Sequence, residues 1–190
     1  MEDNKNTDQE KKESFFSLVK SDVMRWRPTY SHFFFIRLLF LQHGFQLAFS
    51  IRLQQKTIKI PVIGKLLTTL IWYITYIITG ADCSPKAKYG KGLYFPHPSC
   101  VIIGTGVNIK DNISVYQGVT LGRSYYDTVG YPEVKDGAFI YAGAKIIGAV
   151  SIGENSVIGA NAVVTKDVPD NMVAVGIPAK IFPQKKDGSQ

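Results

Sequence analysis

The sequence is poor in the residues that build metal sites and disulfide frameworks. Its 190 residues include two cysteines, Cys83 and Cys100, and three histidines, of which only His97 lies beyond residue 80. Two cysteines without a Cys-x-x-Cys pair form neither a disulfide framework nor a zinc ribbon, and a single histidine does not make a metal cluster. The composition therefore predicts no metal site and a protein of a reducing compartment, which we expect to be the cytoplasm.

We also expect no secretory leader, and the longest uncharged run is short for a membrane span. Residues 1–13 carry five acidic side chains and no apolar run, which is the wrong composition for a signal peptide and predicts a disordered polar tail. Between Lys65 and Asp82 lie sixteen uncharged residues. That is fewer than the roughly 20 that a spanning helix needs.

Acidic residues are scarce over residues 20–65, where eight Lys or Arg face one Asp. These cations alternate with apolar stretches, a mixture that suits an anionic membrane surface better than nucleic acid, so we expect no nucleic-acid partner. Residues 14–80 are predicted to be a helical, apolar and basic segment, with helices over 31–52 and 61–79. Three alternatives stay open: helices packed within an oligomer, helices of residues 20–80 lying in a membrane interface, or a true span.

What the sequence has instead is an internal repeat with a period of six. With one interruption, every sixth position is Ile, Val or Leu. The ten positions are Ile103, Ile109, Val115, Leu121, Val134, Ile140, Ile146, Ile152, Ile158 and Val164. This period fits neither a helix nor a plain alternating strand, but it fits a short strand followed by a tight corner. Residues 81–182 are therefore predicted to form an all-β solenoid of triangular coils with an aliphatic core, followed by a tail over 183–190.

The repeat is interrupted between Leu121 and Val134, which are thirteen residues apart instead of six. We expect a loop of residues 123–133 to leave the coil at this point. Insertions in solenoids often line the binding face.

His97 breaks the rule of the repeat. Counting back six residues from Ile103 reaches His97, so an ionisable imidazole stands where the register predicts an aliphatic residue. An imidazole titrates near neutral pH and suits general-base catalysis, and a local break in a consistent pattern is typical of a functional position. His97 is therefore the candidate base; the alternative is a turn histidine between Pro96 and Pro98.

A resemblance to the hexapeptide-repeat acyltransferases of the serine acetyltransferase family rests on five stretches. They are 92–98 (GLYFPHP), 115–122 (VYQGVTLG), 142–148 (AGAKIIG), 158–169 (IGANAVVTKDVP) and 175–180 (VGIPAK). The resemblance implies a left-handed parallel β-helix after the α-helical segment. It also implies a homotrimer that acts as an O-acetyltransferase and binds its co-substrate acetyl-CoA between neighbouring subunits.

The resemblance further implies roles for individual residues. In the family, the histidine that matches His97 is the general base on an acceptor hydroxyl, and transfer is direct, without an acyl-enzyme. Positions expected to border acetyl-CoA or lie near its phosphates are Gly122, Ala142, Ala160, Lys166 and Lys180.

Two further expectations concern the acceptor and the orientation of the base. The aromatic side chains of the loop are expected to stack on the acceptor; they are Tyr125, Tyr126 and Tyr131. The carboxylates that could orient the imidazole of His97 are Asp82, Asp127 and Glu133.

The sequence departs from the serine-specific pattern at two positions. Pro96 stands where serine-specific members have an acid, and Tyr131 stands where they have a second histidine. With the basic, aromatic N-terminal segment, these departures favour the polysaccharide O-acetyltransferase branch of the family. We therefore predict acetyl transfer to a glycan acceptor, a sugar hydroxyl of a surface polysaccharide or its precursor, in the cytoplasm or on the inner face of the cell membrane. The alternatives are a serine O-acetyltransferase of cysteine biosynthesis and a non-catalytic scaffold.

Overall fold

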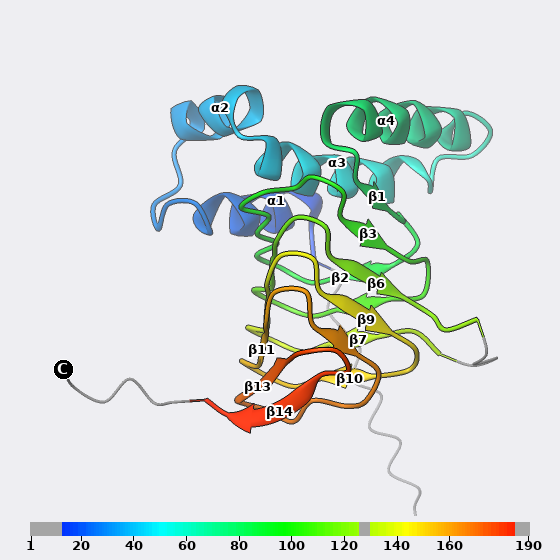
Figure 1. The fold of residues 1–190 in the computed structure, drawn as a ribbon. Helices are drawn as coiled ribbons and strands as arrows, with labels where there is room; N and C mark the ends of the chain where they lie inside the picture. The colour runs from blue at the N-terminus through cyan, green and yellow to red at the C-terminus, as the bar shows by residue number, and fades with distance from the viewer. Residues whose placement is uncertain (1–12, 126–129, 185–190) are drawn as a thin grey trace, which may run out of the picture.

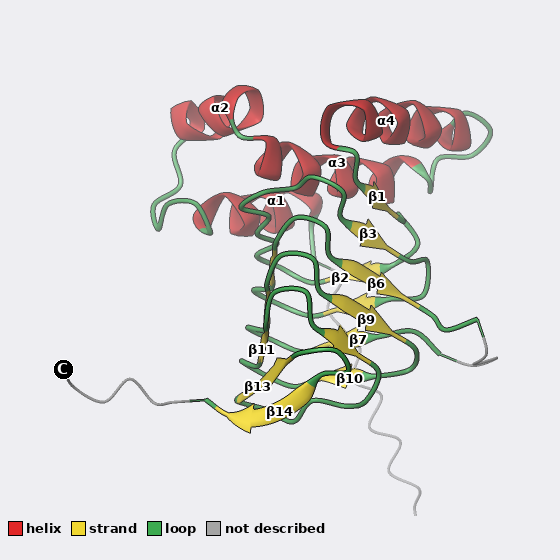
Figure 2. Ribbon diagram, in the orientation of Figure 1, coloured by secondary structure: helices red, strands yellow, loops and turns green. Residues whose placement is uncertain are grey.

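The computed structural model has a layer of helices stacked on one end of a β-helix (Figure 1). It describes residues 13–125 and 130–184. The helices come first in the chain and the strands follow, so the two parts are consecutive in sequence as well as separate in space (Figure 2). The predicted left-handed parallel β-helix with an α-helical N-terminal segment is confirmed.

Three parallel sheets form the sides of the triangular coil. The first sheet contains β1 (Asp82–Cys83), β3 (Ile102–Ile103), β6 (Thr120–Gly122), β9 (Lys145–Ile147) and β12 (Val163–Val164). The second contains β2 (Lys88–Tyr89), β4 (Asn108–Ile109), β7 (Glu133–Val134) and β10 (Ser151–Ile152). The third contains β5 (Ser114–Val115), β8 (Phe139–Ile140), β11 (Val157–Ile158), β13 (Met172–Val175) and β14 (Lys180–Pro183). Strand β14 runs antiparallel to β13 and ends the stack.

The ten aliphatic positions of the repeat form the core of the β-helix. All ten are at most 2% exposed, which confirms their predicted role. Successive coils place them in register, so that Ile109 lies beside Val134 and Leu121 lies beside Ile146. Because full burial of one such side chain contributes roughly 1.5–3 kcal/mol, this column is a main source of the stability of the β-helix.

One corner of the β-helix is wider than the regular ones, and it contains His97. Regular corners place three residues between the buried strand residue and the next buried position, whereas five separate Phe95 from Val101. Tyr94 pairs with Ser114, so Phe95 takes the core position of this coil. The prediction that His97 stands at a core position of the repeat is therefore wrong. His97 replaces no core residue but lies in a corner that is longer by two residues.

The described N-terminal segment forms four helices, α1 (Phe15–Met24), α2 (His32–Leu41), α3 (His43–Thr57) and α4 (Gly64–Thr79). Serine side chains cap the first two, because Ser14 and Ser31 accept hydrogen bonds from backbone N–H groups in the first turn. Gly80, with a φ of 65°, ends α4. The single helix expected over residues 31–52 is wrong. The extended backbone of Gln42 interrupts it, and α2 and α3 meet at 101°.

Helix α3 joins the helices to the β-helix. It contacts α1, α2 and α4, and its side chains Leu47, Ala48 and Ile51 are buried in the same core cluster as the strands. It therefore covers the open end of the aliphatic column, which would otherwise face solvent.

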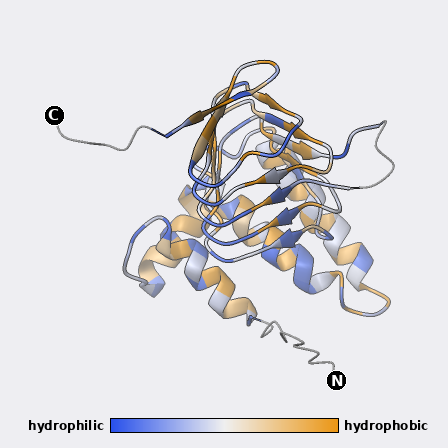
Figure 3. Cartoon of the chain, turned by 90° about the horizontal axis from the view of Figure 1, so that it is seen from below, coloured by the Kyte–Doolittle hydropathy of each residue, from blue (hydrophilic) through white to orange (hydrophobic). Residues whose placement is uncertain are grey.

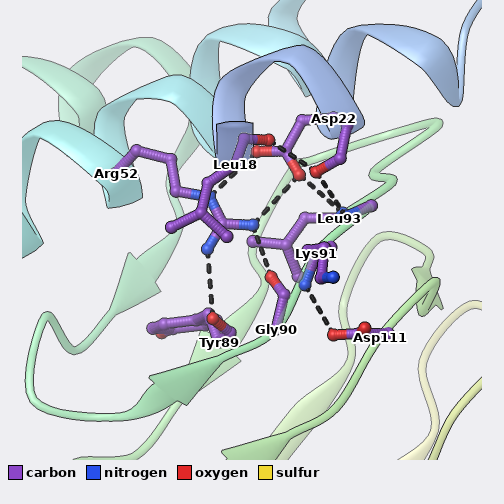
Figure 4. A network of polar contacts seen from close by, with 10 residues as sticks. Leu18, Asp22, Arg52, Tyr89, Gly90, Lys91, Leu93 and Asp111 are labelled. Carbon is purple, nitrogen blue, oxygen red and sulfur yellow. Dashed lines mark hydrogen bonds and ion pairs between the residues drawn. The ribbon is translucent and has the colours of Figure 1, made fainter. Parts of the chain in front are cut away.

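A buried ion pair fastens this joint (Figure 4). Arg52 of α3 donates from Nε and Nη2 to the two carboxylate oxygens of Asp22 in α1, at 2.9 and 3.0 Å, and also to the backbone oxygens of Tyr89 and Gly90. Asp22 in turn accepts from the backbone N–H of Leu93 at 2.8 Å. Burial raises the pKa of the Asp22 carboxyl, against the opposing effect of the Arg52 guanidinium. The pair satisfies backbone groups of the first coil, the last of which, the N–H of Leu93, is four residues before His97.

No single helix in the described part of the chain is long and apolar enough to cross a membrane. Helices α2 and α3 reach the required length and hydropathy only as a sharply bent pair.

Candidate functional site

The corners between the third and first sheets form a continuous edge that we call the corner column. It comprises residues 96–100, 116–118, 141–143 and 159–161. Backbone hydrogen bonds link successive corners: Gly118 donates to Ser99, Gly143 to Gln117 and Asn161 to Ala142, at 2.8–2.9 Å. The last residue of each corner has a positive φ; in three corners it is glycine or asparagine, which adopt this conformation readily, and in the His97 corner it is Cys100.

His97 projects from the top of the corner column. Its side chain is exposed, and its ring lies 6.1 Å from the ring of Tyr116 in the next corner. The widened corner therefore presents the imidazole at the surface of the β-helix, where an acceptor hydroxyl can reach it.

One of the three carboxylates considered as partners of His97 lies on the neighbouring strand. Asp82 in β1 pairs with Ile102, the residue that begins the strand after the His97 corner. Its carboxylate accepts a hydrogen bond from the indole N–H of Trp72 at 2.9 Å, which holds it between α4 and the first sheet. Glu133 belongs to the second sheet, where it accepts from Asn108 and lies 3.7 Å from Lys110. Asp127 lies outside the described residues. Of the two carboxylates that the structure describes, Asp82 is therefore the one next to the strand that follows the His97 corner.

The five positions expected near acetyl-CoA fall into three groups. Ala142 and Ala160 lie in the corner column below His97. Gly122 ends β6 at the opposite edge of the first sheet, and a Cβ built there meets no atom within 4 Å. Lys166 and Lys180 lie at the far end of the β-helix, where Lys166 and residues 178, 179 and 181 line a pocket of about 130 Å³. An extended ligand would therefore have to follow the first sheet along several coils.

The structure describes two of the three loop tyrosines. The ring of Tyr131 packs over the turn from Gly104 to Gly106, where an added Cβ at Gly106 would collide with it. Tyr125 is 94% exposed, and Tyr126 lies outside the described residues. The ring of Tyr131 thus takes part in the packing of the β-helix, and stacking of the loop tyrosines on the acceptor stays a prediction.

Tyrosines that the sequence reasoning missed do stack next to His97. The rings of Tyr116 and Tyr141 are 5.4 Å apart with an interplanar angle of 29°, and Phe139 lies against both. Tyr116 and Tyr141 each follow a core residue of the repeat, Val115 and Ile140, which pair in register. That repeated position was the signal in the sequence that could have found them.

Lys145 is a second residue that the sequence reasoning missed. From β9 its ammonium donates to the backbone oxygen of Gly118 and, at 3.2 Å, to the hydroxyl of Thr120. It places a positive charge on the first sheet, one strand from Gly122.

Comparison with known proteins assigns the family. A family model described as bacterial transferase hexapeptide (six repeats) matches residues 131–166. A serine acetyltransferase solved in complex with CoA is 30% identical with a TM-score of 0.76, and the similarity covers 89% of this chain and 70% of that one. The chain belongs to the serine acetyltransferase family. A soybean serine acetyltransferase complexed with serine gives a TM-score of 0.78 at 30% identity, with 89% and 70% of the two chains covered.

Curated members of the serine acetyltransferase family are similar over the β-helix. The serine acetyltransferase of Mycobacterium tuberculosis is 42% identical over 126 residues, which are 65% of this chain and 54% of that protein. The serine acetyltransferase of Bacillus subtilis is 40% identical over 119 residues, 62% and 55% of the two chains. The chain spans about half the length of the curated relatives it matches.

These comparisons correct the predicted acceptor. The assignment to the polysaccharide O-acetyltransferase branch, with a glycan acceptor, is wrong, because the curated relatives and the solved structures are named serine acetyltransferases. Pro96 and Tyr131 are thus differences of this chain within the serine acetyltransferase family, and they do not indicate a separate branch. The alternative given from the sequence, serine acetylation, is the one that the comparisons favour.

Proposed function

We propose that the protein is an acetyl-CoA-dependent serine O-acetyltransferase. The observation that carries the proposal is the similarity to a serine acetyltransferase solved in complex with CoA, which is 30% identical and covers 89% of this chain. In the same fold, this chain exposes His97 in a widened corner. The serine complex of the soybean relative supports serine as the acceptor.

The reaction needs one base. A serine hydroxyl is a weak nucleophile until its proton is removed, whereas a thioester is already reactive, so a single group that titrates near neutral pH suffices. His97 accepts the hydroxyl proton as the oxygen bonds to the acetyl carbon. When the carbon–sulfur bond breaks, the imidazolium returns that proton to the departing thiolate. The imidazole ends as it began, and no acyl-enzyme forms.

The described residues fit acetyl-CoA along the first sheet. Gly122 leaves open space where a side chain would otherwise stand, so a pantetheine arm can lie against the backbone. Lys145 is placed beside Thr120 on the same sheet, and Lys166 lines the pocket at the end of the β-helix, where a cation suits a phosphate. The proposal includes a homotrimer in which a neighbouring subunit completes this surface.

The test is a measurement of CoA release with L-serine as acceptor. We expect serine-dependent turnover, and we expect His97→Asn to lower kcat by roughly 10²–10⁴-fold, the usual contribution of a general base. His43→Asn is the matched control, because His43 is an exposed histidine at the start of α3. Turnover that does not depend on serine, or equal activity of the two variants, would contradict the proposal.

A further inference from the structure

Helix α4 is amphipathic in the reverse of the usual sense. Its fully buried residues are Gly64, Thr68, Thr75 and Thr79, whereas Leu67, Ile71 and Trp72 are half-buried. The side that it exposes carries Leu66, Leu70, Tyr73, Ile74, Tyr76, Ile77 and Ile78, and its only other exposed residues are Lys65 and Thr69. A helix on the surface of a protein in water buries its apolar side chains and exposes its polar ones. The pattern of α4 therefore suits an apolar surrounding on its outer side.

The contacts between α4 and α3 include pairs of hydroxyl groups. Hydroxyl groups pair across the two helices, Thr75 with Ser50 at 2.5 Å and Thr68 with Thr57 at 2.8 Å. The same threonines bond to backbone oxygens four residues earlier in α4. Small hydroxyl side chains that pack and bond between helices are typical of helices whose outer sides face lipid.

Helix α2 extends the exposed apolar surface. Together with α4 it forms the outermost layer of the molecule, on the side of α3 away from the β-helix (Figure 1). Its exposed apolar side chains are Phe33, Ile36, Phe40 and Leu41. Long stretches of the helical layer have the hydrophobic colours in Figure 3. We call the exposed side chains of α2 and α4 the outer helix face.

A groove opens on this face. Its volume is about 340 Å³, and it runs between the three helices α2, α3 and α4. Apolar residues that line it include Leu39, Phe49, Leu53, Ile71 and Ile78. The apolar side chains that line this groove would suit the acyl chain of a lipid.

The charged side chains on α2, α3, α4 and the segments that join them are all cationic. Residues 23–81 contain no Asp or Glu, while Arg37, Lys59 and Lys65 are exposed on or beside α2 and α4. If a second copy of the chain covered this face, two cationic rims would be brought together. An anionic bilayer supplies the opposite charge to the rim and an apolar layer to the centre.

We propose that the outer helix face docks on the surface of an anionic lipid bilayer. Helices α2 and α4 lie in the plane of the interface, with their apolar side chains at the boundary of headgroups and acyl chains and with Arg37, Lys59 and Lys65 at the lipid phosphates. The β-helix, including His97, then stands on the aqueous side. This docking is independent of the proposed acetyl transfer.

Vesicle flotation of the purified full chain tests the proposal. We expect the protein to float with vesicles of phosphatidylglycerol and phosphatidylcholine, and to bind vesicles of phosphatidylcholine alone much more weakly. Added salt should weaken binding by screening the cations. Protein that stays in solution with both kinds of vesicle overturns the proposal.

Two matched isoleucines locate the contact. Ile77 on α4 is 66% exposed, and Ile177 at the opposite end of the β-helix is 73% exposed. We expect Ile77→Glu to lower partition onto the anionic vesicles by at least about tenfold, because it removes the burial of one large apolar side chain. Ile177→Glu should bind as the wild type does. Equal binding by the two variants, or loss in both, overturns the proposal.

The cations give a second test that leaves the apolar face intact. One Lys near an anionic surface contributes about fivefold in partition, so the double variant Lys59→Gln, Lys65→Gln should bind roughly 25-fold more weakly. Analytical ultracentrifugation without vesicles measures whether a second copy of the chain covers the outer helix face instead. If Ile77→Glu splits a larger assembly while the wild type ignores vesicles, a second copy covers the face and the proposal is wrong.

Discussion

The β-helix and the helical layer use apolar side chains in opposite ways. In the β-helix the aliphatic residues of the repeat point inward and are at most 2% exposed. In α4 the fully buried residues are three of its four threonines and Gly64, while most of its leucines, isoleucines and tyrosines are exposed. The first region makes its own apolar interior, and the second presents an apolar exterior.

The difference follows from how each region closes its core. Each coil of the β-helix covers the side chains of the coil before it, so a six-residue rule is sufficient to define inside and outside. A helix has no such internal cover, and the side that it buries depends on its surroundings. At the joint between the regions, the Asp22–Arg52 pair supplements the apolar packing of α3 with hydrogen bonds to the backbone of the first coil.

Breaking the joint should have the largest effect on stability. Asp22→Asn leaves Arg52 buried without a counter-charge, which typically costs about 3–5 kcal/mol of unfolding free energy. Urea denaturation at neutral pH measures it. The control is Glu13→Gln, which removes the exposed ion pair to Lys91 and should leave the unfolding midpoint unchanged. A similar small effect for both variants would mean that the buried pair does not fasten the two regions.

Substitution of two leucines compares the interior of the β-helix with the outer side of α4. Leu121 in the aliphatic column is 0% exposed, and Leu70 on the outer side of α4 is 53% exposed. Leu121→Ala should lower the unfolding free energy by about 2–5 kcal/mol through lost burial and a cavity. Leu70→Ala should change it by less than about 0.5 kcal/mol in vesicle-free buffer. Denaturant titration of the pair checks both values, and a large loss for Leu70→Ala would show that the outer side of α4 is packed in solution.

The smallest effect is expected when the reactivity of the two cysteine thiols is compared, because labelling of an exposed thiol leaves the fold unperturbed. Burial, helped by the neighbouring Asp82, raises the pKa of the Cys83 thiol, so the reactive thiolate is suppressed there at neutral and moderately alkaline pH. Cys100 in the His97 corner is exposed. We expect N-ethylmaleimide to label Cys100 in the folded protein and Cys83 only after denaturation. Mass spectrometry of wild type and Cys100→Ser distinguishes them, and rapid labelling of folded Cys100→Ser would disprove the burial of Cys83.

The β-helix could be predicted because its signal is local and repeated. Ten aliphatic residues at a fixed spacing have one arrangement that buries them all, and the structure places them as predicted. Helix boundaries were harder, because no proline marks the bend at Gln42, and the nearby glycine, Gly44, lies within α3. The chain ends α2 there so that α3 can turn onto the coil.

The candidate site was predicted in part. His97 was predicted to be the base because counting by sixes placed it at a core position. The pairing of Tyr94 with Ser114 shows that this position belongs to Phe95. The count failed because the length of the corner could not be known from the sequence. Stacking of Tyr125, Tyr126 and Tyr131 on the acceptor stays a prediction, whereas the aromatic rings beside His97, those of Tyr116 and Tyr141, were not predicted. Residues 25 positions apart in the sequence become neighbours only when the coils stack.

The sequence by itself determined that the chain contains a solenoid, where its core residues are, and that a lone histidine near its start stands apart from the repeat. These properties depend on spacing, and spacing along the chain is preserved in the fold. The tertiary structure decided which corner is widened, which tyrosines stack beside His97, and which side of α4 faces outward. Those properties depend on contacts between segments distant in sequence, whose geometry is set only when the helices and coils pack together.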